Sequence, residues 1–242
     1  MTAQANFLAV QHFRSPAPKH APVLLLHGFM SNGAADWPAA AWVEPLLVAG
    51  RDVIVVDLPG HGASARVENA EAARPSRIVA ALADILAEAG GPVDVIGYSL
   101  GARLAWSLAA QSGDLVGKLV LGGLAPNEPF AALDFPAARR FVDEGIAPTD
   151  PLTGFVAGMV ARAPDPHSLL NLAEGLAAEA FDPQREAPAK NVLFLAGTED
   201  PMAGAVDTLE PFIPRSRTLR VPGDHMGALA SEAFRREALA FL

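Results

Sequence analysis

A serine between two glycines is the feature of this sequence that most suggests covalent chemistry. Gly97-Tyr98-Ser99-Leu100-Gly101 joins a β-branched apolar run to a segment with helical periodicity. A tight strand-to-helix turn of the form Gly-x-Ser-x-Gly lifts the serine oxygen to a sheet edge, and the glycines allow close backbone approach. Free amides at the start of the helix would face negative charge that develops there. We interpret Ser99 as a nucleophile; the alternative is a structural turn.

A serine hydroxyl is a weak nucleophile that needs a base, and the sequence offers six histidines. His225 is the candidate, because it follows the last predicted strand in the loop VPGDHMG, where a base can lie over the sheet edge. His12 and His20 lie in a proline-containing N-terminal stretch, and His167 opens a predicted helix. We expect these three histidines at the surface.

A carboxylate must orient that histidine, and Asp200 is preferred because it follows a predicted strand in VLFLAGTEDP. Glu199 beside it is the weaker rival. Asp224 adjoins the histidine in sequence and is expected to serve the turn, because neighbouring side chains on an extended loop diverge. Glu128 or Asp134 could act if the acid had migrated to the region that follows an earlier strand.

Arg103 lies four residues after the serine, on nearly the same face of a helix that should be buried. An unpaired guanidinium would be costly there, so it needs a partner. One interpretation is a salt bridge with a protein group such as Asp57 or Asp36. The others are contact with a substrate carboxylate at the pocket border, and exposure to solvent.

The elements that must position these residues alternate between short apolar strands and longer helical patterns. Continuous apolar runs such as VLLL and VIVV are typical of strands covered on both faces, so we predict an α/β fold with a mostly parallel, doubly wound sheet. The predicted strands are Val23–Leu26, Val53–Asp57, Val93–Gly97, Lys118–Leu121, Val192–Ala196 and Thr218–Val221. The predicted helices are Trp37–Ala49, Pro75–Ala89, Leu100–Gln111 and Gly227–Leu242.

The alternation stops between Leu124 and Ala189, where no strand is predicted. Aspartate–proline signals at Asp150, Asp165 and Asp134 predict N-capped helices in this segment. We therefore predict a helical cap over residues 125–188 that closes the pocket at the carboxyl edge of the sheet. Residues 1–124 and 189–242 would form the core domain.

The amino-acid composition excludes several classes of function. The net charge of −9 disfavours nucleic acid and anionic membrane partners and leaves a small-molecule substrate. Without cysteine, a thiol nucleophile and thiolate metal sites are excluded. No metal-binding or nucleotide-binding motif occurs, so we expect neither a metal nor a cofactor. The N-terminus lacks the pattern of a signal peptide, which predicts a cytoplasmic protein, and nothing in the sequence indicates an oligomeric state.

With its motifs in this order, the chain resembles the α/β-hydrolase fold family over nearly its whole length. His27-Gly28-Phe29 matches the family's His-Gly-x turn after the first core strand, and DLPGHGAS at residues 57–64 matches its next landmark. The resemblance implies that the backbone N–H groups of Phe29 and Leu100 form an oxyanion hole. It also implies that His27 and His61 are structural, and that the cap follows the sixth core strand.

Within the family, HGFMSNGAADW and GYSLGARLAW are similar to a subgroup that includes the menaquinone-pathway synthase that releases pyruvate from a carboxylated intermediate. That subgroup follows its serine turn with an arginine, and Arg103 occupies the matching place, so Arg103 and Tyr98 are candidate substrate-binding residues. The sequence departs from the subgroup at Ala102, where a second glycine is usual, and its cap does not present the other substrate arginines.

Three functions remain in competition. The first is a serine hydrolase that uses Ser99, His225 and Asp200 on an ester, thioester or lactone. The second uses the same triad for C–C cleavage or elimination on a carboxylated substrate. The third is a ligand-binding protein with an intact but slow triad, because a fold does not fix a function.

Overall fold

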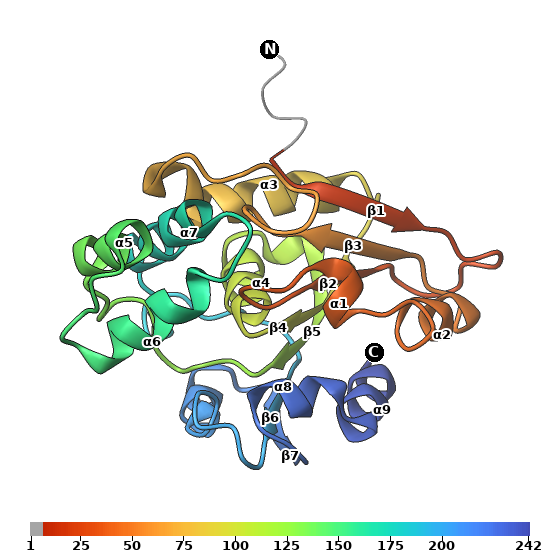
Figure 1. The fold of residues 1–242 in the computed structure, drawn as a ribbon. Helices are drawn as coiled ribbons and strands as arrows, with labels where there is room; N and C mark the ends of the chain where they lie inside the picture. The colour runs from red at the N-terminus through yellow and green to blue at the C-terminus, as the bar shows by residue number, and fades with distance from the viewer. Residues whose placement is uncertain (1–6) are drawn as a thin grey trace.

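The computed structural model describes residues 7–242, which fold around one seven-stranded sheet (Figure 1). The strand order is β1-β3-β2-β4-β5-β6-β7, and every pairing is parallel except that of β1 with β3. The strands are β1 (Ala9–Phe13), β2 (Val23–Leu26), β3 (Val53–Asp57), β4 (Val93–Tyr98), β5 (Val116–Gly122), β6 (Val192–Gly197) and β7 (Ser216–Val221). The doubly wound α/β architecture predicted from the sequence is confirmed.

Helices cover both faces of the sheet. One face packs on α3 (Pro75–Ala87) and α4 (Leu100–Gln111), and the other on α2 (Val43–Val48) and α9 (Glu232–Phe241). The remaining helices are α1 (Gly33–Asp36), α5 (Phe135–Glu144), α6 (Pro151–Val160), α7 (Pro166–Ala178) and α8 (His225–Ala230). Short 3-10 turns occupy η1 (Ala70–Ala73), η2 (Gly113–Leu115) and η3 (Val206–Phe212). Within residues 7–242, none of these helices has the length and apolarity to span a bilayer.

Two predicted helices are wrong in extent. The helix predicted over Trp37–Ala49 is broken, because Trp37 caps the end of α1 and Pro38 follows it, so that residues 39–42 form turns and a regular helix resumes only in α2. The C-terminal helix is split into α8 and α9 at Ser231, whose extended backbone and hydroxyl cap α9 through the Phe234 N–H. β1 was not predicted, because its exposed and half-buried residues carry little apolar pattern.

Residues 125–188, here called the insert, join β5 to β6. They contain α5, α6 and α7 and, as predicted, no strand. Asp134, Asp150 and Asp165 each cap the helix that follows them. The insert follows the fifth strand of this sheet, not the sixth as expected, because the described chain places four strands before β5.

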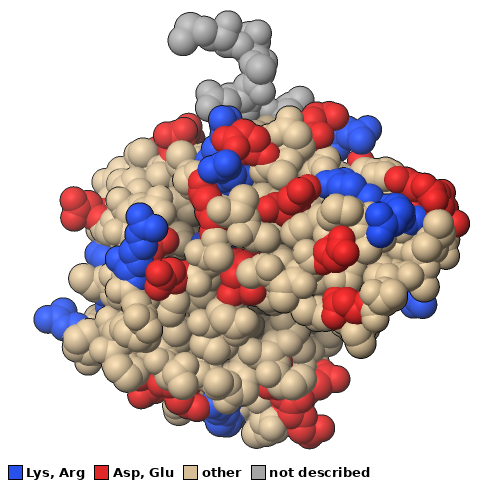
Figure 2. Space-filling model, turned by 90° about the vertical axis from the view of Figure 1, so that its left-hand side faces the viewer, with Lys and Arg blue, Asp and Glu red and all other residues tan. Residues whose placement is uncertain are grey.

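The insert lies beside the carboxyl edge of the parallel strands, toward which β3 points in Figure 1. Its three helices share a small apolar cluster that includes Val160 and Leu170 and that also packs against Phe29 of the core. On the face that the insert presents, charged side chains gather mainly in the upper part, and a broad uncharged band separates them from a few charged groups at the lower rim (Figure 2). α6 contains no charged residue and exposes Leu152 and Phe155.

Candidate active site

Ser99 stands at a sharp turn between β4 and α4, near the middle of the sheet. Its φ of 51° lies in the left-handed region, which is strained for a residue with a side chain. The turn is tight because a Cβ on Gly97 would lie 2.4 Å from the Gly101 carbonyl oxygen, and one on Gly101 would lie 2.1 Å from the Leu26 carbonyl oxygen. Both glycines are therefore required by backbone contact, as the sequence predicts.

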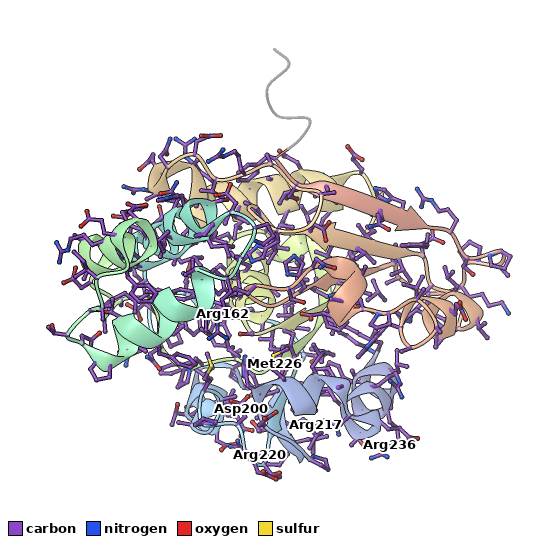
Figure 3. All side chains as sticks on the ribbon, viewed as in Figure 1. Arg162, Asp200, Arg217, Arg220, Met226 and Arg236 are labelled. Carbon is purple, nitrogen blue, oxygen red and sulfur yellow. The ribbon has the colours of Figure 1, made fainter. Side chains whose placement is uncertain are left out.

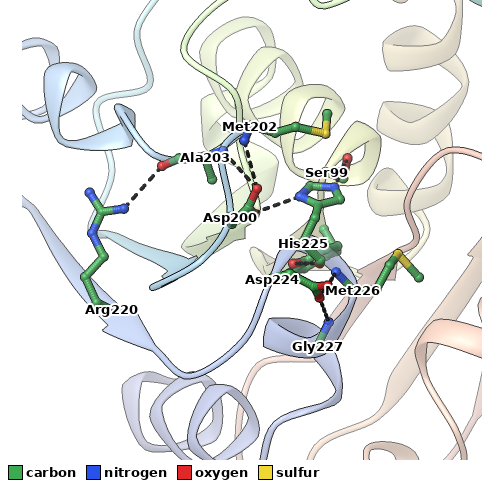
Figure 4. Close-up of polar contacts among 10 residues, drawn as sticks. Ser99, Asp200, Met202, Ala203, Arg220, Asp224, His225, Met226 and Gly227 are labelled. Carbon is green, nitrogen blue, oxygen red and sulfur yellow. Dashed lines mark hydrogen bonds and ion pairs between the residues drawn. The ribbon is translucent and has the colours of Figure 1, made fainter. Parts of the chain in front are cut away.

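The structure brings Ser99, His225 and Asp200 together from three separate loops (Figure 4). The Nε2 atom of His225 lies 3.0 Å from the Ser99 hydroxyl, and its Nδ1 atom lies 2.8 Å from the Asp200 carboxylate. His225 begins α8 just beyond β7, and Asp200 follows β6. A hydroxyl, an imidazole and a carboxylate in this order can activate the hydroxyl by proton transfer.

The Asp200 carboxylate is buried and held on both oxygens. While one oxygen contacts the histidine, the other accepts the backbone N–H groups of Met202 at 2.9 Å and Ala203 at 3.2 Å. Burial alone would raise the pKa of Asp200, but these hydrogen bonds and the histidine outweigh it and lower the pKa, so the group stays ionised. Arg220 supports the loop by donating to the carbonyls of Ala203 and Gly204.

The rival carboxylates have other roles. Glu199 is exposed and makes no side-chain hydrogen bond among the described residues. Asp224 caps α8 through the N–H groups of Met226 and Gly227, which is the turn role expected of it. Asp134 caps α5, and Glu128 pairs with an arginine described below.

The other predicted surface histidines lie where expected. His12 and His20 are exposed near the N-terminal part of the described chain. His167 is half-exposed at the start of α7, where its Nε2 atom lies 3.0 Å from Asp143. None of the three lies in the Ser99 network.

The loop that follows β2 lies against the serine turn. A Cβ on Gly28 would lie 3.5 Å from the Cβ of Ser99, and the next residue is Phe29. Within residues 7–242, no hydrogen bond occupies the backbone N–H of Phe29 or that of Leu100. Met30, at φ 60°, and Ser99 are the two non-glycine residues of the described chain with positive φ. Within the described part of the chain, the left-handed backbone conformation of non-glycine residues is thus found only at this site.

Buried polar side chains hold this loop in place. His61 Nε2 accepts the Met30 N–H at 2.8 Å, and Asp36 accepts the Gly28 N–H at 2.8 Å. His27 accepts the Leu58 N–H at 2.9 Å while its other ring nitrogen faces the Gly28 carbonyl. Both histidines therefore act as acceptors in their neutral forms, consistent with the structural role that the resemblance implies.

Burial keeps these two histidines neutral. It lowers the pKa of His61 to about 4, with a further contribution from His27, and it also lowers the pKa of His27. The two rings contact each other edge to face, with centroids 5.1 Å apart. A proton on either acceptor nitrogen would face a backbone N–H, so protonation would break the loop's hydrogen bonds.

Tyr98 is not placed as a substrate-binding side chain. It is 2% exposed, lies in the core cluster between the sheet and α9, and donates its hydroxyl to the His225 carbonyl. Side chains alternate across a strand, so Tyr98 points beneath the sheet edge where Ser99 emerges. The prediction is corrected: Tyr98 supports the backbone of His225, and burial raises the pKa of its hydroxyl well above the usual value.

Arg103 is buried and hydrogen-bonded to protein groups. Its guanidinium donates to Ser107 Oγ at 2.7 Å and to the Glu179 carbonyl at 2.8 Å, and it pairs with Glu128 at 3.4 Å. The expected salt bridge exists, but its partner is Glu128 and neither Asp57 nor Asp36. Those two aspartates accept backbone N–H groups in the loops after β2 and β3. The substrate-binding prediction for Arg103 is not supported.

Sequence reasoning missed two residues that fix the loops of the site by hydrogen bonds. Asp36 was considered only as an arginine partner, and Arg220 was not considered at all. An aspartate within a glycine-containing loop is a usable signal, because the free N–H groups and hydroxyls of such a loop need an acceptor. For Arg220 the sequence offers no such signal, because its partners, two carbonyls and the Asp207 carboxylate, lie on the irregular segment after β6.

Exposed methionines border the site. Met202 and Met226 follow Asp200 and His225 and are 42% and 66% exposed, and Met30 follows Phe29. Figure 3 shows Asp200 and Met226 on the β6–α8 side of the molecule, below the end of α6 and Arg162. Thioether side chains give a surface that adapts to apolar groups of different shape.

Comparison with known proteins identifies the family of the chain. The sequence model of the Alpha/beta hydrolase family matches residues 23–237. An esterase of Mycobacterium tuberculosis is 37% identical over 125 residues, which cover 51% of this chain and 39% of the esterase. The 2-succinyl-6-hydroxy-2,4-cyclohexadiene-1-carboxylate synthase of Pectobacterium atrosepticum is 36% identical over 111 residues, or 44% of this chain and 40% of the synthase.

Among solved structures, MenH from S. aureus superposes with a TM-score of 0.72 at 19% identity, covering 96% of this chain and 97% of that one. That likeness shows a shared fold. The chain matches less than half the length of the two sequence relatives just described. The family match covers most of the chain, which therefore belongs to the Alpha/beta hydrolase family.

Proposed function

We propose that this Alpha/beta hydrolase family member is a serine hydrolase that cleaves an ester, thioester or lactone of a small molecule through an acyl-enzyme. The observation that carries the proposal is the position of the His225 ring, 3.0 Å from the Ser99 hydroxyl and 2.8 Å from the Asp200 carboxylate. The separation of His225 from the Ser99 hydroxyl allows direct proton transfer. The Asp200 carboxylate fixes the ring tautomer that leaves Nε2 free to accept a proton.

The reaction has two balanced halves. The Ser99 oxygen attacks the carbonyl carbon while His225 takes the hydroxyl proton, and the tetrahedral intermediate collapses as His225 returns that proton to the leaving alcohol or thiol. Water then attacks the acyl-enzyme, gives its proton to His225, and releases the acid as Ser99 regains a proton. Asp200 stays ionised and stabilises the imidazolium in both halves. Side chains and water suffice, so the proposal includes no cofactor or metal.

The backbone N–H groups of Phe29 and Leu100 are the proposed oxyanion hole. Leu100 follows Ser99 in the chain, and Phe29 follows Gly28, which lies against the Ser99 turn. Neither N–H has a hydrogen-bond partner within the described residues. Buried side chains fix the Phe29 loop from below, so its donors need little reorganisation when charge develops on the substrate oxygen.

The insert is the proposed cap, and residues 1–124 and 189–242 the core domain. Its Phe130 ring lies 5.0 Å from that of Phe29, so the insert meets the core next to the proposed oxyanion hole. The methionines that border the site favour an uncharged, apolar acyl group. The C–C-cleaving alternative loses its main support, because Arg103, its expected carboxylate-binding residue, is occupied by protein groups.

Covalent labelling tests the proposal. A fluorophosphonate probe should add once to the native protein, on the peptide that contains Ser99, and intact-protein mass spectrometry should show no adduct on Ser99→Ala. The hydrolysis of short-chain p-nitrophenyl esters then separates an enzyme from a slow ligand-binding protein. An unlabelled native protein, or an adduct that persists in Ser99→Ala, would contradict the acyl-enzyme mechanism.

A further inference from the structure

The Arg103 guanidinium joins three separate parts of the chain. It donates to Ser107 on its own helix α4, to the Glu179 carbonyl at the end of α7, and to Glu128 between β5 and α5. The last two partners lie 76 and 25 residues away in sequence. The arginine and Glu128 side chains are only 7% and 3% exposed.

The two partners outside α4 are the two ends of the insert. Glu128 lies in the segment by which the chain enters the insert, and Glu179 lies in the segment by which it leaves. The Phe181 ring in the leaving segment also packs 5.5 Å from the Arg103 guanidinium. One side chain thus fixes both stems to the helix that begins at Ser99.

We propose that Arg103 is a positioning residue, which together with Glu128 clamps both stems of the insert to α4 and so sets the place of the insert over Ser99. Few contacts connect Glu128 to the proposed active site. The Glu128 carboxylate also accepts the Phe130 N–H, and the Phe130 ring contacts Phe29, whose N–H we assign to the oxyanion hole. This inference rests on the proposed function where it concerns turnover, but its structural part does not.

The buried pair should behave as a unit. Burial raises the pKa of Glu128, whereas Arg103 and the N–H groups of Phe130 and Phe181 lower it. Removal of one charge leaves its partner buried without a counter-charge, which costs more than removal of both. A double-mutant cycle is therefore the appropriate test, with Arg103→Met, Glu128→Leu and the combined variant.

In that cycle each single variant should raise KM for esters with bulky acyl groups about tenfold and change hydrolysis of acetyl esters much less. The combined variant should be no worse than the more damaging single one. Amide hydrogen exchange should rise in residues 125–134 and 176–187 and stay unchanged in β4. A charge-conserving control, Arg103→Lys, should not restore KM, because an ammonium cannot span three fixed acceptors.

Chemical rescue gives a second readout. Arg103 lines a cavity of about 390 Å³ between α3, α4 and the leaving stem, together with Ser76, Glu179 and Glu186. In Arg103→Ala, guanidinium at a non-denaturing concentration should enter the vacated volume and restore both slow exchange in the stems and the KM for bulky esters. Sodium chloride at equal ionic strength should restore neither.

A different pattern would overturn the clamp. If Arg103→Met loses activity only on carboxylated substrates, while the stems exchange as slowly as in the native protein and Glu128→Leu behaves normally, Arg103 binds substrate. Failure of the proposed function looks different, because the native protein would then resist the fluorophosphonate probe. The exchange and rescue measurements would still decide on the clamp.

Discussion

Two polar networks meet helix α4 near its N-terminus, and they differ in their exposure to solvent. The Ser99 network is open: its histidine side chain is 20% exposed, and its serine stands at a strained turn. The Arg103 network, one turn further on, is closed and almost entirely buried. A nucleophile must meet a ligand, whereas a clamp must exclude competing water. Ser99 and Arg103 are four positions apart on one face of the helix. The proposed chemistry thus lies one helical turn from the contacts that hold the insert.

The largest effect on activity should come from removing members of the open network. Ser99→Ala, His225→Ala and Asp200→Asn should each lower kcat by about 10⁴ or more, because the three act as a unit. The triple variant should be little worse than Ser99→Ala. Steady-state kinetics on a neutral ester measure this non-additivity.

Glu199→Gln is the matched control for the acid, since Glu199 adjoins Asp200 but is exposed. Its activity should equal that of the native protein. Near-normal turnover in Asp200→Asn with a large loss in Glu199→Gln would move the acid by one position. Equal, additive losses from all three triad variants would indicate that no triad operates.

The sequence predicts the open network better than the closed one, because the two networks draw their members from different kinds of segment. Ser99, Asp200 and His225 are distant in sequence, but each lies where a predicted parallel strand ends, and such ends meet at one edge. The partners of Arg103 lie in irregular stems with no periodicity. That the arginine needed a partner could be derived from its burial; that the partner is Glu128 depends on how the insert packs.

The same reasoning applies to the elements. The continuous apolar runs of β2, β3 and β6 predicted buried strands, because both faces are covered. β1 was missed, because an edge strand that pairs on one side needs less apolar surface. The N-caps of α5, α6 and α7 were predicted correctly, since an Asp–Pro signal acts within one turn.

A fall in pH should destabilise the loop under the open network, because its buried histidine is neutral in the folded protein. The pKa of His61 is about 4 in the folded protein and 6.5 when unfolded, so the unfolded chain binds the extra proton first. The free energy of unfolding therefore falls as the pH drops from 6.5 toward 4. The neutral His61 accounts for about 3 kcal/mol of stability, present in full above pH 6.5 and lost over that range. Urea unfolding at several pH values measures it.

His61→Asn should unfold with a weaker pH dependence across that window. A residual slope should remain, because burial lowers the pKa of His27 in the same direction. His12→Asn, at an exposed position, is the control and should keep the native slope. Parallel curves for the native protein and His61→Asn would show that the histidine does not titrate with folding.

The smallest expected effect comes from an ion pair inside the insert that lacks burial. Arg139 on α5 bonds Glu174 and Asn171 on α7, with the charged pair 31% and 40% exposed. Arg139→Met should cost less than about 1 kcal/mol of unfolding free energy, because solvent screens the pair and two long side chains lose freedom in making it. Arg103→Met should cost about 3 kcal/mol or more, since it leaves Glu128 buried without its counter-charge.

High salt should erase the Arg139 difference and leave the Arg103 difference nearly unchanged, because ions reach only the exposed pair. Urea unfolding of both variants at low and high salt measures this. Equal costs with equal salt dependence would mean that burial does not distinguish the two arginines.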